Sequence, residues 1–196
     1  MTLNSDISYP IHALIEKRWS PRSFSEKDIS QEDLRSLLEA ARWAPSCFNE
    51  QPWAFIIARK SDVKDFQTML SCLVEANRIW AQGAPVLAIA IAKTQFSRNG
   101  NPNRHALHDV GLAVGQMGIQ AMSLGIYMHQ MAGIHAETIR QSYQLPPECE
   151  PVTAIAFGYP GPPHQLPEAL AAREQAPRQR HTQDQFVFTS KWQNPL

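Results

Sequence analysis

The chain has 196 residues, of which 43% are hydrophobic and 18% are charged, a composition typical of one folded globular domain. Its 18 basic residues balance 18 acidic residues, so no net charge would draw the chain to nucleic acid or to an anionic membrane. No apolar run approaches the roughly 20 residues that span a bilayer, which favours a cytoplasmic protein.

The cysteines and the N-terminal residues favour the same compartment. Cys47, Cys72 and Cys149 form no C-x-x-C pair, and three cysteines cannot all be matched in disulfides within one chain. Reduced thiols in a cytoplasmic protein are therefore expected rather than a disulfide framework. Residues 1–10 lack the basic-then-apolar pattern of a signal peptide, so we expect no export signal there.

The first half of the chain alternates helical and strand patterns. Apolar residues at spacings of three and four predict helices, and short apolar runs rich in aromatic and β-branched residues predict buried strands. Ser30 is a predicted N-cap, and Pro45 stops the helix that follows it. The predicted elements are a helix at 12–18, a helix at 31–43, a strand at 53–58, a helix at 63–80 and a strand at 86–92.

The second half holds the longest predicted helix and a proline-rich stretch. The predicted elements are a polar loop at 95–103, a helix at 104–124, a strand at 127–131, a helix at 136–143 and a strand at 152–157. Many of the 15 prolines fall between Pro146 and Pro177, which predicts extended or looped chain there rather than helix. The pattern as a whole predicts an α+β protein with a mixed or mainly antiparallel central sheet flanked by helices.

Glycines interrupt the longest predicted helix. Gly111, Gly115 and Gly118 each cost about 1 kcal/mol relative to alanine in a helix. Close approach of another backbone or of a flat ligand would explain them, and tight packing in the core would explain them equally well.

The end of the chain regains apolar character at Phe186, Phe188 and Trp192, well beyond the last predicted strand. We expect this tail to pack on another surface, with a second subunit as one candidate.

Three polar clusters could carry chemistry. The first, Arg18 to Arg22, sets a serine hydroxyl between two arginines, which can hold a phosphate or another anion, although such a segment alone is usually a solvated loop. The second, Ala44 to Trp53, gathers serine and amide side chains that suit the edge of a planar heterocycle, or form an ordinary connecting loop. The third is the basic tail cluster of Arg173, Arg178, Arg180 and His181. Such a tail is most often solvated, and it lacks the interleaved aromatics of a nucleic-acid arm.

The motifs that hold these clusters follow one another in a fixed order. They are R-W-S-P-R-S-F from Arg18, A-R-W-A-P-S-C-F-N-E-Q-P-W from Ala41, H-D-V-G-L-A-V-G-Q-M from His108, V-T-A-I-A-F-G-Y-P-G from Val152 and A-P-R-Q-R-H from Ala176. The first two resemble the R-R-S-x-R-x-F opening and the A-P-S-x-x-N-x-Q-P-W loop of the nitroreductase-like FMN-dependent oxidoreductases. The others are similar to that family's glycine-containing central helix, last core strand and late basic motif, so the resemblance covers nearly the whole chain.

The resemblance implies a nitroreductase-like fold and a homodimer with two tightly but non-covalently bound FMN molecules at the subunit interface. The chain would be one FMN-binding domain, residues 1–196, with 162–196 as an extended tail that wraps the other protomer. The positions it implies around FMN are Arg18, Trp19, Ser20 and Arg22 (phosphate, ribityl chain or pyrimidine edge), Pro45, Ser46, Cys47, Asn49 and Gln51 (isoalloxazine, from the partner subunit), Gln130, Met131 and Gly133 (reactive edge), and Arg178 and Arg180 (phosphate).

The activity that the resemblance implies is NAD(P)H oxidoreduction. Hydride from transiently bound NAD(P)H would pass through FMN to a small organic acceptor (a nitroaromatic, quinone or enone) in ping-pong order. Because the flavin carries the chemistry, no side chain is assigned as a general acid or nucleophile, and no metal, nucleic acid or membrane is expected.

One segment departs from the family pattern. Several better-known members carry Pro-Ile-Glu-Gly before the reactive edge of the flavin, where this chain has Gln130-Met131-Ala132-Gly133. The acidic side chain is missing at Ala132, which leaves nicotinamide handling and acceptor preference open. The glycine is present, so a backbone N–H to the flavin stays expected at Gly133.

Three rival hypotheses follow from other features. His105, His108 and Asp109 could share a helical face as metal ligands, although two histidines without a third diagnostic ligand are a weak pattern. The chain could be a flavin-binding dimer without NAD(P)H turnover, or belong to a dehalogenating, flavin-cleaving or dehydrogenating branch, which usually has a larger lid than residues 95–103. A Rossmann domain is not supported, because no G-x-G-x-x-G turn joins a strand to a helix.

Overall fold

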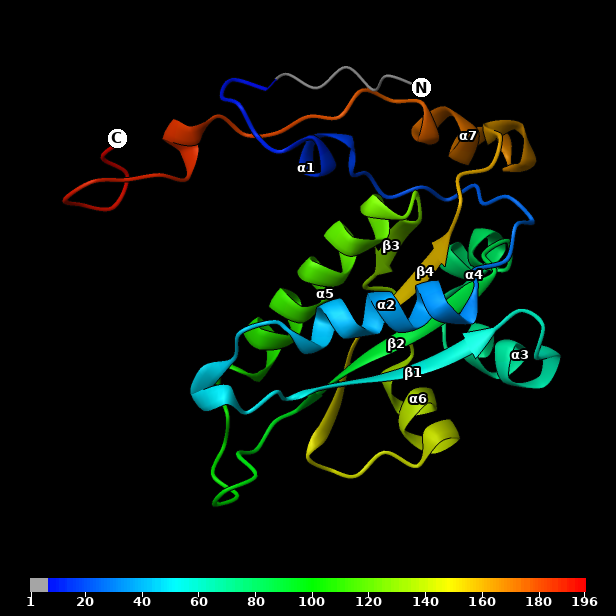
Figure 1. Ribbon diagram of the computed structural model, residues 1–196, viewed down its shortest axis with the longest axis horizontal. Helices are drawn as coiled ribbons and strands as arrows, with labels where there is room; N and C mark the ends of the chain where they lie inside the picture. Colours follow the sequence, from blue (N-terminus) through cyan, green and yellow to red (C-terminus); the bar gives the residue numbers. More distant parts are fainter. Residues whose placement is uncertain (1–6) are drawn as a thin grey trace.

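Four antiparallel strands form the sheet at the centre of the protein: β1 (Trp53–Arg59), β2 (Val86–Lys93), β3 (Tyr127–Met131) and β4 (Cys149–Gly158). Their order across the sheet is β1-β2-β4-β3, and every neighbouring pair is antiparallel. The computed structural model (Figure 1) describes residues 7–196, and residues 1–6, most of the segment inspected for a signal peptide, lie outside the described residues. The predicted α+β class with an antiparallel sheet is confirmed.

The two central strands are apolar on both faces, as their near-continuous hydrophobic sequences predict. In β2, Ala88 and Ala90 face one hydrophobic cluster, while Leu87, Ile89 and Ile91 face another on the opposite side of the sheet. This alternation follows from the two-residue period of a strand. A sheet with two apolar faces must be covered on both sides.

Helices provide that cover (Figure 1). Buried residues of α2 (Gln31–Arg42) and α5 (Ala106–Ser123) belong to the first cluster. Those of α3 (Val63–Ser71), α4 (Glu75–Ala81) and α6 (Ala136–Tyr143) belong to the second. The short α1 (Ala13–Lys17) lies beside α5. No helix in the described part of the chain has the length and hydropathy needed to cross a membrane.

The prediction of one helix over residues 63–80 is wrong, because the chain breaks between α3 and α4. Leu73 forms an isolated antiparallel bridge with Ile134, and the Val74 N–H donates to the Gly133 carbonyl at 3.2 Å. The Cys72 and Leu73 N–H groups still donate to carbonyls of α3, at 3.1 Å each, whereas the Val74 N–H has a long-range partner in place of an intrahelical one. Helical periodicity continues across the break because both helices bury residues in the same cluster.

The prediction that residues 146–177 contain no helix is also wrong. The helix α7 (Glu168–Glu174) begins directly after Pro167 and lies in a stretch without proline. Proline is tolerated at the start of a helix, where its missing N–H leaves no bond unmade. Leu170 packs against the second hydrophobic cluster, which attaches α7 to the body of the protein.

Two of the α5 glycines, Gly111 and Gly115, are not explained by core packing within the chain. A Cβ atom built at Gly111 or Gly115 meets no atom within 4 Å, and both residues lie on the exposed side of the helix. They line a groove of about 540 Å³ with Trp43 and Ile119. Of the two explanations that the sequence left open, tight packing in the core is therefore excluded at these two positions.

After α7 the chain runs as a tail beside α1 and ends beyond the body of the protein (Figure 1). The side chains of Phe186, Trp192 and Leu196 are 62%, 82% and 86% exposed. The Phe188 and Trp192 rings, both in the tail, pack against each other with their centroids 5.0 Å apart. Within one chain the apolar residues of the tail remain largely in solvent.

Candidate functional site

The first predicted cluster and the basic tail meet in three dimensions. Arg18, Trp19, Ser20 and Arg22 follow α1 and line a cavity of about 230 Å³ together with residues 173–180 of the tail. Some 150 residues of sequence separate the two segments, and the extended tail brings them together. The arginines from both ends of the chain thus line one cavity.

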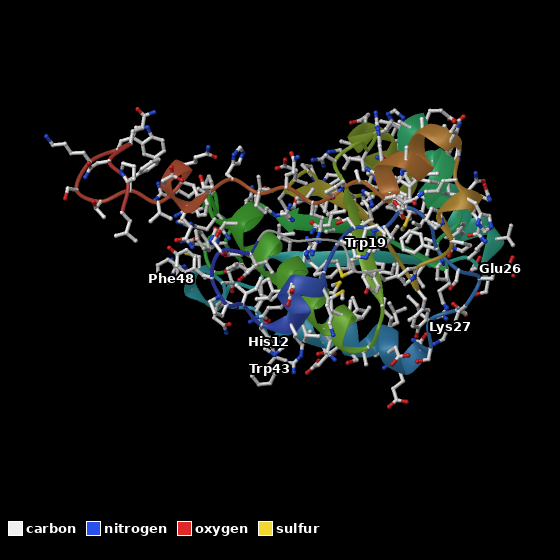
Figure 2. All side chains as sticks on the ribbon, turned by 90° about the horizontal axis from the view of Figure 1, so that it is seen from above. His12, Trp19, Glu26, Lys27, Trp43 and Phe48 are labelled. Atoms are coloured by element: carbon white, nitrogen blue, oxygen red, sulfur yellow. The ribbon has the colours of Figure 1, made fainter. Side chains whose placement is uncertain are left out.

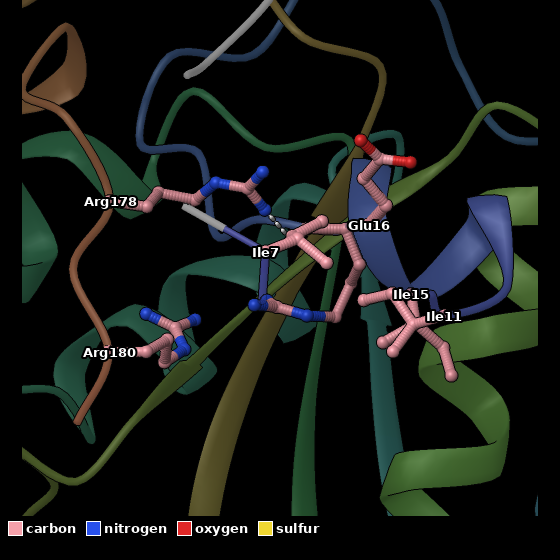
Figure 3. Close-up of a pocket in the computed structure, with 7 residues that line it drawn as sticks. Ile7, Ile11, Ile15, Glu16, Arg178 and Arg180 are labelled. Carbon is pink, nitrogen blue, oxygen red and sulfur yellow. Dashed lines mark hydrogen bonds between the residues drawn. The ribbon is translucent and has the colours of Figure 1, made fainter. Parts of the chain in front are cut away.

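The cavity holds an excess of positive charge that the chain itself does not neutralise. Burial, together with the charges of Arg180 and Arg178, lowers the pKa of the Arg18 guanidinium. Arg178 donates from Nη1 to the Arg18 carbonyl at 2.9 Å, but its buried Nε has no hydrogen-bond partner among the described residues (Figure 3). An unpaired buried N–H is costly, and a bound anion with several acceptor oxygens would satisfy it.

Arg18, Arg178 and Arg180 also line a second cavity. Ile7, Ile11 and Ile15 form its apolar wall, opposite Arg178 and Arg180, around about 300 Å³ (Figure 3). The guanidinium groups can therefore be reached from two sides. A ligand bearing a phosphate can place apolar or hydroxylated parts beside the arginines without displacing them.

One residue essential to this geometry was not singled out from the sequence. The Glu174 side chain, 3% exposed, accepts hydrogen bonds from the Arg22 N–H at 2.8 Å and from the Ser23 N–H at 2.9 Å. It also lies 3.9 Å from the Arg22 guanidinium. Glu174 ends α7, so it joins the tail to the segment after α1. From the sequence alone, its acidity among basic neighbours was the only available signal.

The third implied contact region lies on β3, at the edge of the sheet. Gln130 and Ala132 are exposed, whereas the Met131 side chain is 2% exposed and belongs to the core. The Gly133 carbonyl accepts from Asn77 Nδ2 at 3.1 Å, while the Gly133 N–H has no acceptor among residues 7–196. The contact between this N–H and a flavin stays a prediction.

Gly133 has a second reason to be glycine. A Cβ atom there would lie 2.6 Å from Val74 Cγ2 and 2.7 Å from Asn77 Nδ2, distances that real Cβ atoms do not adopt. The close approach of this turn to the start of α4 therefore requires glycine even without a ligand.

His129 ties β3 to the arginine segment. Its Nδ1 lies 2.9 Å from the Pro21 carbonyl, to which it donates, and its ring lies 4.4 Å from that of Trp80. Burial is the main cause that lowers the pKa of His129 to about 4, with the Pro21 carbonyl opposing it and Arg22 reinforcing it. The imidazole is therefore neutral at neutral pH.

We expect His129 to destabilise the protein in mild acid. In the unfolded chain His129 takes up a proton near pH 6.5, whereas in the folded chain it does so only near pH 4. The neutral imidazole's full contribution to the free energy of unfolding is therefore present above pH 6.5 and is lost as the pH falls toward 4. The loss is at most about 3 kcal/mol. Thermal unfolding of the wild type and of His129→Gln across this range measures it, with exposed His164→Gln as control. Parallel pH profiles of the wild type and His129→Gln would contradict the prediction.

The second predicted cluster forms a tight loop around the 3-10 helix η1 (Cys47–Asn49). Ser46 Oγ accepts from the Gln51 N–H at 2.9 Å, and the Cys47 N–H donates to the Asp109 carboxylate at 2.9 Å. The Asp109 side chain is 3% exposed and lies in the first turn of α5. Asp109 thus anchors the loop, a role that its sequence position did not indicate.

The loop carries backbone strain and exposed amides. Phe48, Asn49 and Gln51 all adopt positive φ angles, of 54°, 56° and 52°. Left-handed conformations cost non-glycine residues about 1 kcal/mol or more each, and such strain concentrates at functional sites. Asn49 and Gln51 are exposed, and Gln51 Nε2 donates to the Asn49 carbonyl at 3.0 Å within the loop. The exposed Asn49 side chain can meet a ligand from outside this chain.

The structure does not bring the loop and the arginine cavity together within one chain. The loop is bonded to the first turn of α5, whereas Trp19 packs against Tyr127, just beyond the last turn, at 6.1 Å. Figure 1 shows the two regions at opposite ends of α5, whose 18 residues span about 27 Å. A single site that uses both regions needs loops from two chains.

The histidines at the start of α5 have bonding partners within the chain. His105 Nε2 lies 3.3 Å from Arg104 Nε, and His108 Nδ1 lies 3.0 Å from the Asp109 carboxylate. Among residues 7–196 no three histidine, cysteine or acidic side chains lie close enough together to hold a metal ion.

Comparison with known proteins agrees with this geometry. An FMN-containing oxidoreductase of known crystal structure superposes with a TM-score of 0.92, at 31% identity, over 99% of this chain and 98% of that chain. A 15.4 kDa protein of Mycolicibacterium smegmatis is 32% identical over 129 residues, which are 66% of this chain and 86% of its own length. A protein of Archaeoglobus fulgidus, provisionally named NADH dehydrogenase/NAD(P)H nitroreductase, is 27% identical over 75% of this chain and 83% of its own length.

The family model described as the Nitroreductase family matches residues 15–159. This range includes the segment after α1, the strained loop, α5 and the whole sheet. The family and fold predicted from the sequence motifs are both confirmed: the chain belongs to the nitroreductase family.

Proposed function

We propose that the protein is a homodimeric, FMN-dependent NAD(P)H oxidoreductase that reduces a small organic acceptor such as a nitroaromatic, quinone or enone. The observation that carries the proposal is the arginine cavity with its unpaired Arg178 Nε. A phosphate needs several cationic donors in a partly buried place, and this cavity supplies five arginines against the single carboxylate of Glu174.

The chemistry of the donors fits FMN. Arg18, Arg22, Arg178 and Arg180 would hold the phosphate, with the Ser20 hydroxyl as a neutral donor. The free Gly133 N–H would meet the ring near its reactive edge, and exposed Gln130 stands on the same strand edge. Pro45, Ser46, Cys47, Asn49 and Gln51 would come from the partner subunit, because their own chain holds them at the other end of α5.

The exposed groove on α5 supports the dimer. Gly111 and Gly115 have open space around them and lie beside Trp43, which is 71% exposed. A second copy of the chain packed there would explain both the glycines and the exposed indole, because glycine lets two helix backbones approach closely. The exposed aromatics of the tail would then cover the partner protomer.

The residues of this chain would position and stabilise rather than react. A bound FMN supplies hydride transfer, from NAD(P)H and onward to the acceptor in ping-pong order. The arginines fix the phosphate end, and a backbone N–H at the ring edge stabilises the charge that develops on reduction. The exposed loop leaves the ring face open to NAD(P)H and acceptor in turn.

The test is the visible absorption spectrum of the purified protein, recorded before and after NADH or NADPH is added without oxygen. We expect a flavin spectrum that bleaches with at least one donor and returns when a nitroaromatic or quinone is added. A flavin spectrum that persists with both donors would favour the alternative, a flavin-binding dimer without NAD(P)H turnover. A protein that neither contains nor binds FMN would overturn the proposal.

A further inference from the structure

We propose that Phe48, Phe96 and Arg98 form a subsite that selects the acceptor, and that it favours planar acceptors carrying a carboxylate. The proposal deepens the function proposed above and rests on it, because it places the acceptor beside the loop assigned to the flavin. It concerns the hairpin of residues 95–102, which the sequence predicts only as a polar loop.

The three side chains form one cluster between two segments of the chain. The rings of Phe48 and Phe96 meet edge to face with centroids 5.9 Å apart. The Arg98 guanidinium carbon lies 4.3 Å from the Phe48 centroid and 5.3 Å from the Phe96 centroid. The guanidinium thus lies over one face of the Phe48 ring and close to Phe96, while most of the Phe48 side chain stays exposed.

The hairpin that carries Arg98 is fixed by hydrogen bonds. The Phe96 N–H donates to the Asn101 carbonyl at 2.8 Å, and the Asn103 N–H donates to the Thr94 carbonyl at 2.7 Å. The Ser97 N–H donates to the Glu50 carboxylate at 2.7 Å, which ties the hairpin to the strained loop. Arg98 is therefore held beside the loop rather than on a freely moving segment.

The Phe48 side chain is exposed to solvent, and the backbone conformation of Phe48 is constrained. Its side chain is 72% exposed, and its φ angle of 54° is one that a bulky residue adopts only under constraint from its surroundings. Figure 2 shows Phe48 at the surface, away from Trp19. It lies between Cys47 and Asn49, two residues that the proposed function assigns to the flavin.

The charge of Arg98 is not neutralised by the chain. No carboxylate lies within 4.0 Å of its guanidinium in the described part of the protein. The nearby Glu50 carboxylate already accepts from Ser97, and Arg104 points to His105. A planar acceptor could stack on the phenyl rings while its carboxylate accepts from the guanidinium, which presents two parallel donors to such a group.

The experiment compares a charged and a neutral acceptor of nearly equal shape, 4-nitrobenzoate and 4-nitrobenzamide, on the flavin-loaded protein. The readout is the ratio of their kcat/KM values, in the wild type and in Arg98→Gln, so that the intrinsic reactivity of each acceptor cancels. We expect Arg98→Gln to lower the ratio about tenfold through a higher KM for 4-nitrobenzoate, and Arg98→Lys to restore part of it. Arg104→Gln removes the same charge nearby and should leave the ratio unchanged.

A binding measurement separates this proposal from the function on which it rests. Calorimetric titration of the same proteins with benzoate and benzamide requires no turnover, and bleaching of the flavin by NAD(P)H reports the function independently. Benzoate binding about tenfold tighter than benzamide binding, and lost in Arg98→Gln, supports the subsite even if no donor bleaches the flavin. Equal binding of the two ligands, or an unchanged kcat/KM ratio in Arg98→Gln, overturns it.

Discussion

Replacing Arg178 by glutamine is expected to weaken FMN binding about 100-fold, the effect of about 3 kcal/mol lost with one buried, charge-assisted donor. The flavin-free protein should keep its stability. Although the variant loses the 2.9 Å bond to the Arg18 carbonyl, it also relieves repulsion among Arg18, Arg178 and Arg180, which lowers the pKa of Arg18 together with burial. The substitution therefore separates binding from folding.

Flavin titration followed by fluorescence measures the affinity, and thermal unfolding without flavin measures the stability. Arg140→Gln is a matched control, since Arg140 lies on α6 and outside the cavity. If Arg178→Gln bound FMN with wild-type affinity, the arginine cavity would not be the phosphate site.

The same variant tests whether each site is shared between two chains. Arg178→Gln damages the arginine side, and Asn49→Ala damages the loop side. A heterodimer of the two variants would have one site with both lesions and one site with none. Because random exchange makes about half of the dimers heterodimers, mixing the two proteins should restore flavin binding at about a quarter of the sites. A site contained within one chain would recover nothing.

The largest expected loss of stability comes from Glu174→Ala. The substitution leaves the N–H groups of Arg22 and Ser23 without their acceptor and removes the acidic side chain that lines the arginine cavity. The loss should be about 3 kcal/mol, which for a chain of this size lowers the unfolding midpoint by roughly 10 °C.

Thermal unfolding measures this effect, with Glu168→Ala as control because Glu168 is an exposed residue of the same helix. Glu174→Gln should fall between the two. Its amide oxygen can still accept from both N–H groups, but its amino group would face the Arg22 guanidinium. A midpoint for Glu174→Ala within about a degree of the wild type would show that the buried carboxylate does not hold the tail.

The residue pattern within single segments was sufficient to predict most helices and strands. The strands β2 and β4 are near-continuous apolar runs because both faces of the sheet are covered, and α2 is marked by its Ser30 cap, whose hydroxyl accepts from the Asp33 N–H at 2.9 Å. Motif order also sufficed to identify the family, and the family model matches residues 15–159.

Where sequence reasoning failed, long-range contacts decided the outcome. The break between α3 and α4 arises from the pairing of Leu73 with Ile134, some sixty residues away, and periodicity cannot register such a partner. The helix α7 forms in a region rich in prolines because Leu170 and Glu174 gain partners in the distant N-terminal half. Propensity is a weak prior that such contacts override.

The sequence by itself determined the fold class, the family and the residue types of the arginine segments, since these depend on local periodicity and on motifs that can be recognised within single segments. Only the tertiary structure decided which of those residues meet. It joined Arg18 to Arg178, assigned Glu174 and Asp109 as anchors, and placed the strained loop at the far end of α5. The physical reason is that burial, unpaired donors and distances across a helix of about 27 Å are properties of the packed chain and not of any segment within it.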